Sequence, residues 1–341
     1  MPALTLPAEF ERYAAFPREL FEGNPYWRPT DEHGLIAEIS NQSAYAAHSR
    51  AQAFWIVDGS RVVAVVTAMV DDLYRAQRKE KAGHLLFFDA RPDCEDEAAS
   101  VLEEACRWLR GQDAEFARLG LKFGWQLPYT IDAYDAPPTI LHTYNPPYYH
   151  RHIKNAGFAT EKGVVEFRVQ FTAALAERYR QLTSPEGATL RPWDFSRLEE
   201  ETDRFSRLLN DTFAEHWGFG RFTIEELGGL THGLRDFLVP EFCWFAEVDG
   251  EAAGFVFSLP DLNQGEAITH GVLLIIGVSK KFRGRGINTA LGARSYLAMI
   301  DRGYQSASYT VVLDDNWPSR RTAEKLGCRV ARNFCIYRRE L

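Results

Sequence analysis

The stretch Val-Ser-Lys-Lys-Phe-Arg-Gly-Arg-Gly-Ile-Asn-Thr-Ala-Leu, residues 278–291, decides how this chain is interpreted. It follows an apolar run that predicts a strand over Val272–Val278, and it opens a pattern that predicts a helix over Ile287–Asp301. Glycines let the backbone of such a turn approach a ligand, and amides at the start of a helix attract anions. Four cations lie within six residues of the turn, namely Lys280, Lys281, Arg283 and Arg285. The turn is therefore predicted to hold a phosphate-bearing ligand.

Two common phosphate-binding motifs do not fit the same turn. A dinucleotide-binding fingerprint would have a third glycine where this chain has Thr289. A P-loop would need Gly-Lys-Ser/Thr after a four-residue gap, which this turn does not have. From these residues alone, a basic surface loop that caps a helix is an equally good interpretation.

Composition limits the class of protein. A chain of 341 residues is long for one core, so two domains are expected. With 39 Lys and Arg against 47 Asp and Glu, the net charge is −8, which disfavours nucleic acids and anionic membranes as partners. The longest strongly apolar run, Val272–Ile276, is too short to span a bilayer. Five cysteines without a CxxC pair and an N-terminus unlike a signal peptide favour a soluble cytoplasmic protein with free thiols.

Hydrophobic periodicity predicts an alternation of helices and strands in both halves of the chain. In the first half we expect helices over Pro7–Phe21, Glu95–Arg110 and a short stretch ending at Gly157, and strands over Ala53–Val57, Arg61–Val70, His84–Asp89, Leu119–Trp125 and Val164–Phe171. In the second half we expect helices over Arg197–Trp217, Thr223–Phe237, Ile287–Asp301 and Trp317–Leu326, and strands near Leu190 and over Phe242–Val248, Ala252–Leu259, Val272–Val278, Ala307–Leu313 and Arg329–Tyr337. The loop Thr183–Gly187 is the expected domain boundary.

The two halves look like weak copies of each other. Trp55–Gly59 parallels Trp244–Gly250, and Asn145–Phe158 parallels Asn316–Cys328. The order hairpin, strand, helix, strand, short helix, strand occurs in both halves. We therefore expect two domains of the same fold.

The turn that opens the second-half helix resembles the acyl-CoA motif of the GNAT superfamily of N-acetyltransferases, Arg/Gln-x-x-Gly-x-Gly/Ala. Here the motif corresponds to Arg283–Asn288, with Asn288 in place of the final small residue. Residues 188–341 follow the GNAT order of elements, and Asn316–Gly327 is similar to the family's Asn-x-x-Ala…Glu-Lys-Leu-Gly segment. The whole chain also resembles a bacterial family of tandem GNAT-like proteins through Asn145–Tyr149, His216–Phe219, Pro260–Asn263 and Ile336-Tyr337.

The resemblance implies a fold class and a domain division. The class is α/β, with two GNAT-like domains that each have a mixed, mostly antiparallel sheet flanked by helices. Residues 1–172 would form a degenerate N-terminal domain, and residues 188–341 the acyl-CoA-binding domain. The first copy has acidic residues over Asp89–Glu97 where the motif should lie, so we expect it to bind no CoA.

The resemblance also implies the residues that hold the cofactor. Pantetheine would lie between the motif strand and the next strand, against backbone groups of Ile276 and Val278 and beside Asn316. Gly277 would supply the bulge that separates these strands. The diphosphate would be held by backbone amides of Arg283, Gly284, Arg285, Gly286, Ile287, Asn288 and Thr289. The 3′-phosphate would meet Lys280, Lys281 or Arg320.

The function implied is transfer of an acetyl group from acetyl-CoA to a primary amine of a small molecule or peptide, with no metal, nucleic acid or membrane as partner. The amine must lose a proton, so a base is needed. Many GNAT enzymes have a Tyr as general acid where this chain has Ala323. The substitutes we consider catalytic candidates are Tyr309, His270 and Tyr337, with Asp261 and Glu266 as further bases and Glu215–Trp217 as an acceptor contact.

Two other functions remain open on sequence grounds. The missing Tyr and the degenerate first copy also fit a non-catalytic acyl-CoA-binding or scaffold protein. An aminoacyl-tRNA-dependent transferase would also use paired GNAT-like domains, but the acidic charge disfavours a tRNA partner. The sequence specifies neither the acceptor nor the oligomeric state.

Overall fold

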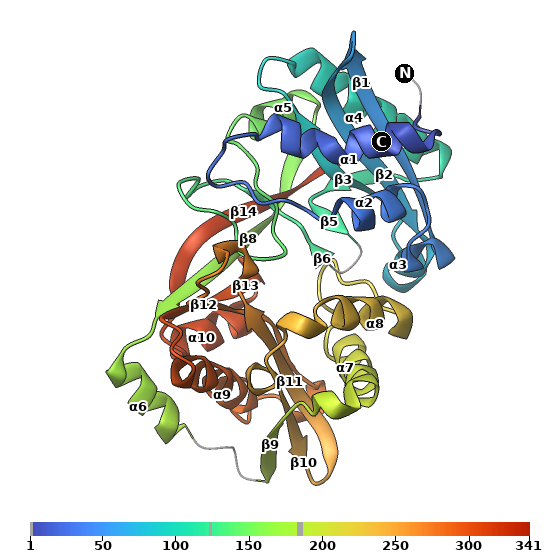
Figure 1. The fold of residues 1–341 in the computed structure, drawn as a ribbon. Coiled ribbons are helices and arrows are strands. Elements are labelled where there is room, and N and C mark those ends of the chain that lie inside the picture. Colours follow the sequence, from blue (N-terminus) through green and yellow to red (C-terminus); the bar gives the residue numbers. More distant parts are fainter. Residues whose placement is uncertain (1–2, 123–124, 183–186) are drawn as a thin grey trace. The chain divides into compact units, whose positions relative to one another are not determined.

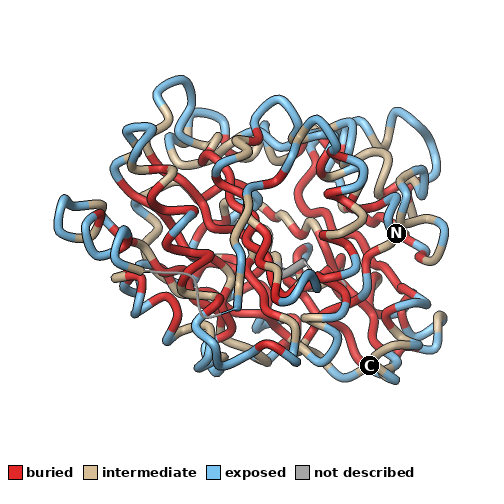
Figure 2. The backbone as a smooth tube through the Cα atoms, turned by 90° about the horizontal axis from the view of Figure 1, so that it is seen from below, coloured by how far each residue is buried: buried red, intermediate tan, exposed pale blue. Residues whose placement is uncertain are grey.

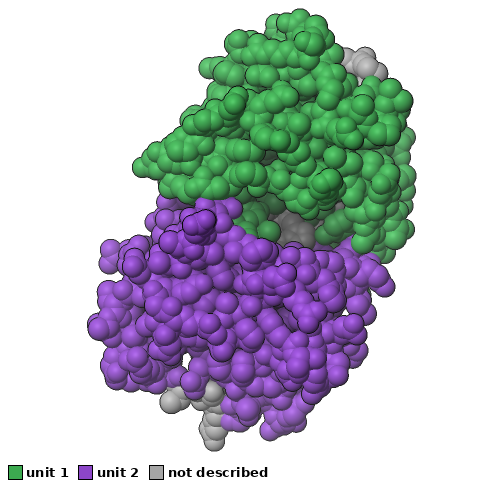
Figure 3. Space-filling view, in the orientation of Figure 1, with its two compact units in different colours: residues 1–163, 218–221, 334–341 green, residues 164–217, 222–333 purple. Residues whose placement is uncertain are grey.

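The computed structural model describes residues 3–122, 125–182 and 187–341. The chain divides into two compact units (Figure 3). Unit 1 consists of Met1–Gly163, Gly218–Arg221 and Phe334–Leu341, and unit 2 consists of Val164–Trp217 and Phe222–Asn333. Each unit contains its own set of paired strands with helices on both faces.

Unit 1 is built on the sheet order β1-β2-β3-β4-β14 (Figure 1). Its main elements are α1 (Pro7–Leu20), α2 (Glu32–Ile39), β1 (Ser49–Asp58), β2 (Arg61–Asp71), α3 (Asp72–Arg78), β3 (Ala82–Ala90), α4 (Glu95–Gly111), β4 (Phe116–Leu119) and α5 (Tyr149–Asn155). Only β3 and β4 run parallel. Alternate residues of the strands point to opposite faces. Helix α4 therefore packs with Val66 on one face, and α1 packs with Val65 on the other.

Unit 2 has the sheet order β8-β13-β12-β11-β10-β9. Its elements are β8 (Ala159–Gln170, in unit 2 from Val164), α6 (Ala173–Gln181), β9 (Ala188–Pro192), α7 (Leu198–Thr212), α8 (Ile224–Gly233), β10 (Trp244–Val248), β11 (Glu251–Pro260), β12 (His270–Val278), α9 (Ile287–Asp301), β13 (Ser306–Leu313), α10 (Trp317–Lys325) and β14 (Arg329–Glu340, in unit 2 to Asn333). Only β12 and β13 run parallel.

The core of unit 2 lies on both faces of its sheet. On one face, Leu291 of α9 packs with Val256 in the largest buried cluster of the unit. On the other face, Phe205 of α7 stacks on Phe257, with ring centroids 5.6 Å apart. The central strands are buried along nearly their whole length, and exposure is concentrated in loops and turns (Figure 2).

The predicted fold class is confirmed, since each unit has a mixed, mostly antiparallel sheet flanked by helices. Helix α9 has the predicted bounds. The strand predicted over Leu119–Trp125 is wrong as a continuous element. Gly120, with φ of 95°, separates β4 from the short β5 (Leu121–Lys122), and residues 123–124 lie outside the described residues. The first long helix of the second half ends at Thr212 rather than at Trp217.

The compact units divide the chain differently from the predicted boundary at Thr183–Gly187, of which residues 183–186 lie outside the described part. The reason is strand pairing. Residues Tyr337–Glu340 of β14 pair with β4 in unit 1, and Val164–Gln170 of β8 pair with β13 in unit 2. Each sheet thus contains a strand from the other half of the sequence. As repeated sequence units, residues 1–172 and 188–341 stay a prediction.

The predicted repeat is visible in matching strand registers. Four residues of β3, Ala82–Leu85, pair in parallel with β4, and four residues of β12, His270–Leu273, pair in parallel with β13. The first residue after β3 and the first residue after β12 each donate a backbone hydrogen bond to the preceding antiparallel strand. Arg91 N–H donates to Val63 O (3.0 Å), and Ser279 N–H donates to Ala253 O (2.9 Å). Ala90 in unit 1 therefore corresponds to Val278 in unit 2.

Two further features bear on the expected location. Among the described residues, no helix is at once long enough and apolar enough to cross a bilayer. All five cysteines are unpaired thiols, and four of them are buried.

Candidate functional site

Strands β12 and β13 separate part of the way along unit 2. They pair only over His270–Leu273 and Ser306–Tyr309, although β12 continues to Val278. The register of β11 against β12 shifts at the same level, where Phe257 faces Ile275 and Ser258 faces Leu273. The bulged residue is therefore Leu274. The expectation that Gly277 forms the bulge is wrong, because Gly277 pairs in register with Phe255.

Gly277 has a different role, which is to let the end of α7 lie against β12. A Cβ at this position would lie 2.7 Å from Thr212 Cγ2 and 3.0 Å from Phe213 Cε2. Both distances are too short for an ordinary contact. Any larger residue at 277 would push the end of α7 away from the strand.

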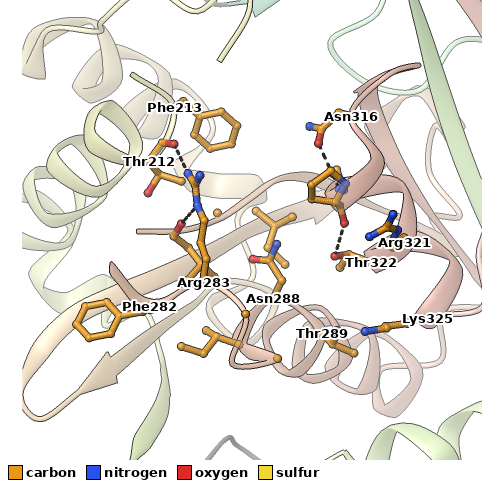
Figure 4. Close-up of a pocket in the computed structure, with 18 of the residues that line it drawn as sticks. Thr212, Phe213, Phe282, Arg283, Asn288, Thr289, Asn316, Arg321, Thr322 and Lys325 are labelled. Carbon is orange, nitrogen blue, oxygen red and sulfur yellow. Dashed lines mark hydrogen bonds between the residues drawn. The ribbon is translucent and has the colours of Figure 1, made fainter. Parts of the chain in front are cut away.

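A cavity of about 480 Å³ opens where the two strands separate (Figure 4). It is lined from the end of α7 and the residues after it, from β12, from the turn that follows β12, from the first turn of α9, and from one face of α10 along its length. The lining residues are Thr212, Phe213, His216, Ile276, Gly277, Val278, Phe282, Arg283, Gly284, Gly286, Ile287, Asn288, Thr289, Asn316, Pro318, Ser319, Arg321, Thr322 and Lys325. Of the residues predicted to hold the pantetheine arm and the diphosphate, all line this cavity except Arg285, whereas none of the three cations predicted for the 3′-phosphate does.

The turn after β12 needs its two glycines for their backbone conformation. Gly284 has φ of 81° and Gly286 has φ of 77°, a region that other residues enter at a cost. Gly286 is the N-cap of α9 and has no side chain with which to cap the first helical amides. The start of this 15-residue helix therefore presents amides and the positive end of its dipole to the cavity.

The cations of the turn are arranged differently from the expectation. Only Arg283 lines the cavity, and its guanidinium donates to Val278 O (3.1 Å) and Thr212 O (2.9 Å). Lys280 pairs with Glu215 (3.2 Å). Three further cations also lie outside the lining, with Lys281 paired to Glu251, Arg285 over the ring of Phe282, and Arg320 donating to the Asp314 carbonyl.

Besides Arg283, the cations that line the cavity come from α10, which sequence reasoning missed. Arg321 and Lys325 line the cavity on successive turns of this helix, near Thr289 at the start of α9 (Figure 4). Neither side chain forms an ion pair with any residue that the structure describes. Their spacing of four residues, which places both on one helix face, was the available signal.

Two buried oxygen atoms at the cavity have no hydrogen-bond partner within the described residues. They are Thr212 Oγ1 and Asn288 Oδ1. Buried polar atoms are normally satisfied, so a polar ligand in the cavity would remove a cost here. Asn288, which replaces the small residue of the family motif, thus presents a polar group where the ligand is expected.

The structure does not bring the three predicted catalytic residues together at the cavity. Tyr309 is 2% exposed, and its hydroxyl bonds to Ser319 Oγ (2.8 Å), so Ser319 lies between it and the cavity. Burial raises the pKa of Tyr309 well above its usual value. Tyr337 lies in the core of unit 1, where its hydroxyl contacts His150, and burial raises its pKa as well.

His270 is 3% exposed at the start of β12 and is likewise outside the lining. Its ring nitrogens bond to Ser306 Oγ (2.7 Å) and Ser308 Oγ (2.8 Å), and Ser308 donates to Glu166 Oε1 (2.5 Å). Burial lowers the pKa of His270 to about 4, so the ring is neutral near pH 7. Asp261 and Glu266 do not line the cavity either.

His216 is the predicted acceptor contact that does line the cavity. Its Nδ1 lies 3.1 Å from Trp217 O, and its Nε2 lies 3.4 Å from Asn316 Nδ2. Asn316 Oδ1 accepts the amide of Ser319 (3.3 Å) and so caps α10. This contact joins the end of α7 to the start of α10 across the cavity.

In unit 1, tyrosines occupy the corresponding place. Counted back from Gly157 and Gly327, Tyr149 stands where unit 2 has Ser319. The Tyr149 hydroxyl accepts the amide of Ala90 (3.2 Å) and donates to Asp89 Oδ1 (2.7 Å). Tyr148 donates to the Ala90 carbonyl (2.9 Å). In unit 1, tyrosine hydroxyls are thus hydrogen-bonded to the backbone amide and carbonyl of Ala90, the residue that corresponds to Val278.

A carboxylate occupies the corresponding anion position of unit 1. Arg151 and Asn155 of α5 stand where unit 2 has Arg321 and Lys325. Both contact Glu95, the first residue of α4, with Arg151 Nε 3.4 Å from Oε1. Unit 1 therefore supplies its own anion at the start of the helix, whereas the described residues of unit 2 supply none to Arg321 and Lys325.

Comparison with known proteins agrees with this geometry. Residues 202–328 match the model of the acetyltransferase (GNAT) family. A protein of Caulobacter vibrioides (strain NA1000 / CB15N) named bacterial ceramide synthase is 27% identical, over 98% of this chain and 96% of its own length. Protein YghO of Escherichia coli K12 is 25% identical over 83% of this chain and 74% of its own length.

Solved structures with the same architecture include a tandem GNAT protein from the clavulanic acid biosynthesis pathway. It superposes with a TM-score of 0.60 at 12% identity, covering 98% of this chain and 94% of that one. A GCN5-related N-acetyltransferase from Sphaerobacter thermophilus gives 0.56 at 14% identity, with the same coverage of both chains. These likenesses concern the fold. Residues 202–328 therefore correspond to a domain of the acetyltransferase (GNAT) family, and the fold of the whole chain is similar to that of a tandem GNAT protein.

Proposed function

We propose that this chain is an N-acyltransferase that moves an acyl group from an acyl-CoA to a primary amine at the cavity of unit 2. The observation that carries the proposal is the combination, in one cavity, of separated strands, a helix start with uncapped amides, and the cations Arg321 and Lys325. Acyl-CoA has a thin pantetheine arm, which matches the separated strands. It also has a phosphate-rich end, which matches the helix start and the two cations.

Within this proposal, each part of the cavity has a share in binding. Amides of the turn from Arg283 to Thr289 hold the diphosphate, and the two α10 cations add charge to the phosphate end. Backbone groups of Ile276 face the pantetheine arm. The Val278 carbonyl already accepts from Arg283, so Ile276 is the stronger partner of the two. Thr212 Oγ1 and Asn288 Oδ1 supply acceptors for amide or hydroxyl protons of the ligand.

In the first candidate function, the acyl group is acetyl and the acceptor is the primary amine of a small molecule or peptide. A second candidate is favoured by the relative named ceramide synthase, which matches nearly the full length of this chain. A ceramide is the amide of a long-chain amino alcohol, so this reaction would use a long-chain acyl-CoA and a sphingoid amine. The bond formed is an amide in both cases.

The test is calorimetry of acetyl-CoA and palmitoyl-CoA, followed by thiol-release assays with sphinganine, spermidine and an alanyl peptide. We expect micromolar binding of at least one donor and release of CoA that depends on an amine. Gly286→Glu places a carboxylate at the helix start and should abolish binding. Gly265→Glu is the matched control, because Gly265, like Gly286, has a positive φ (84° and 77°) but does not line the cavity.

The outcomes separate the possible functions. Absence of binding by wild-type protein to either donor contradicts the proposal. Binding without thiol release across all three amines favours the non-catalytic acyl-CoA-binding alternative. Turnover restricted to palmitoyl-CoA and sphinganine selects the second candidate over acetyl transfer.

A further inference from the structure

His216 is the titratable group at the cavity whose ordinary pKa lies near neutrality. The other ionisable side chains in the described lining are the cations Arg283, Arg321 and Lys325. Resting on the proposed acyl transfer, we propose that His216 Nε2 is the base that accepts the proton of the acceptor amine. Sequence reasoning considered the segment Glu215–Trp217 only as an acceptor contact.

The fold holds His216 at this position through Gly277. Because Gly277 has no side chain, Thr212 and Phe213 lie directly against β12, and the chain leaves α7 beside the separated strands. The rings of Phe213 and His216 pack with centroids 5.4 Å apart. The end of α7, which leads into His216, thus packs against β12, the strand that lines the donor side of the cavity.

Hydrogen bonding selects the tautomer that a base needs. The Trp217 carbonyl can only accept, so the Nδ1 atom at 3.1 Å carries the proton and Nε2 is left with a lone pair. Asn316 agrees with this assignment independently. Its Oδ1 accepts the Ser319 amide, so its Nδ2 faces His216 as a donor at 3.4 Å. That contact is long, so an incoming amine can replace it at small cost.

The charged side chains near His216 come from several segments. Arg283 lies on the turn after β12, and Arg321 and Lys325 lie on α10, all in the lining of the same cavity. Glu215, its neighbour in sequence, is exposed and paired with Lys280 (3.2 Å). The described lining contains no carboxylate, so the imidazole of His216 is its candidate base.

Every proton and electron pair in the proposed acyl transfer is accounted for. The amine nitrogen attacks the thioester carbonyl carbon, a C–N bond forms, and the carbonyl π pair moves to oxygen while the amine proton moves to His216 Nε2. The intermediate then collapses, the C–S bond breaks, and the electron pair leaves with sulfur. His216 returns the proton to the thiolate, which yields an amide, free CoA thiol and the original imidazole.

The experiment compares His216→Gln with His232→Gln, a control at an exposed position of α8 outside the cavity lining. With the best donor and amine of the panel above, we expect His216→Gln to lower kcat by about 10²- to 10⁴-fold. The KM for acyl-CoA and its calorimetric affinity should stay unchanged. The acidic limb of the kcat/KM profile should disappear, and added imidazole should partly restore turnover in His216→Ala. His232→Gln should match the wild type.

A second measurement does not depend on turnover. Long-range proton–nitrogen spectra of the imidazole groups, assigned by the signal lost in His216→Gln, should show the proton of His216 on Nδ1. A proton on Nε2, or kcat of His216→Gln within threefold of the control, would overturn the base assignment and leave the proposed function intact. A wild type without turnover on any amine overturns both.

Discussion

Two histidines of unit 2 differ in what they can do because their surroundings differ. His270 and His216 have the same side chain, but His270 is enclosed between two serine hydroxyls whereas His216 lines the cavity. Sequence reasoning preferred His270 because it begins the motif strand. The sequence does not show that two serines of the neighbouring strand, Ser306 and Ser308, bond to both ring nitrogens. These contacts depend on the register between β12 and β13, which is known only from the structure.

The burial of His270 predicts a pH-dependent stability. Its pKa falls from 6.5 in the unfolded chain to about 4 in the folded protein. Above pH 6.5 neither state binds the proton. Between these values the unfolded chain binds it and the folded chain does not, so stability is lost as pH falls. From pH 7 to pH 4 this group should remove on the order of 3 kcal/mol from the free energy of unfolding.

Urea unfolding across this pH range measures the effect. His270→Gln should lose less stability than the wild type on acidification, by the amount attributed to this one group. His232→Gln, at an exposed position, should follow the wild type. Parallel pH curves for wild type and His270→Gln would contradict the burial argument.

At the scale of elements, the positions of most helices and strands followed from the sequence, whereas the separate roles of the cations did not. The bounds of α9 were predicted correctly from its apolar pattern and its glycine turn. The basic cluster beside that turn was taken as the source of positive charge. In the structure Lys280 and Lys281 pair with glutamates from other segments, and the cations that line the cavity are Arg283 and two residues of α10. Pairing between distant segments is not encoded in local spacing.

Helix α10 therefore yields a binding prediction. Each exposed cation contact contributes about 1 kcal/mol, so Arg321→Ala with Lys325→Ala should weaken acyl-CoA affinity roughly 30-fold. The loss should shrink at high salt, because these side chains are exposed. Calorimetry at two salt concentrations measures it. Arg294→Ala, at an exposed position of α9 outside the cavity, is the control.

The same variants can locate the phosphate involved. If the α10 cations hold the 3′-phosphate, the double variant and the wild type should bind dephospho-CoA equally well. If the cations hold the diphosphate, the difference should persist with dephospho-CoA. Unchanged affinity for both ligands would exclude α10 from the binding of phosphate.

For the whole molecule, the repeat makes unit 1 an internal comparison for unit 2. The two units share strand order and register, and they differ in what occupies the opening between the parallel strands. Unit 2 has Ser319 and two cations there, and unit 1 has tyrosine hydroxyls on Ala90 and a carboxylate at the start of α4. The sequence predicted the repeat and the acidic helix start. It did not predict the tyrosines, because their hydrogen bonds join α5 to β3 across 58 and 59 residues.

This comparison predicts one acyl-CoA per chain. Calorimetry of wild type with its best donor should give a stoichiometry near one, and Gly286→Glu should leave no site. Opening unit 1 with Tyr149→Ser should not create a second site, because Glu95 still holds the anion position. A stoichiometry of two, or residual full-affinity binding in Gly286→Glu, would show that unit 1 also takes the ligand.

The pairing of Tyr337–Glu340 with β4 has a consequence for how the polypeptide is made. These residues are translated after all of unit 2, so the first unit leaves the ribosome with β4 paired to β3 but with its other edge still open. Its sheet can be completed only after unit 2 has been synthesised. Until then an open strand edge has to be kept from joining other chains, which makes the order of synthesis part of the folding problem for this protein.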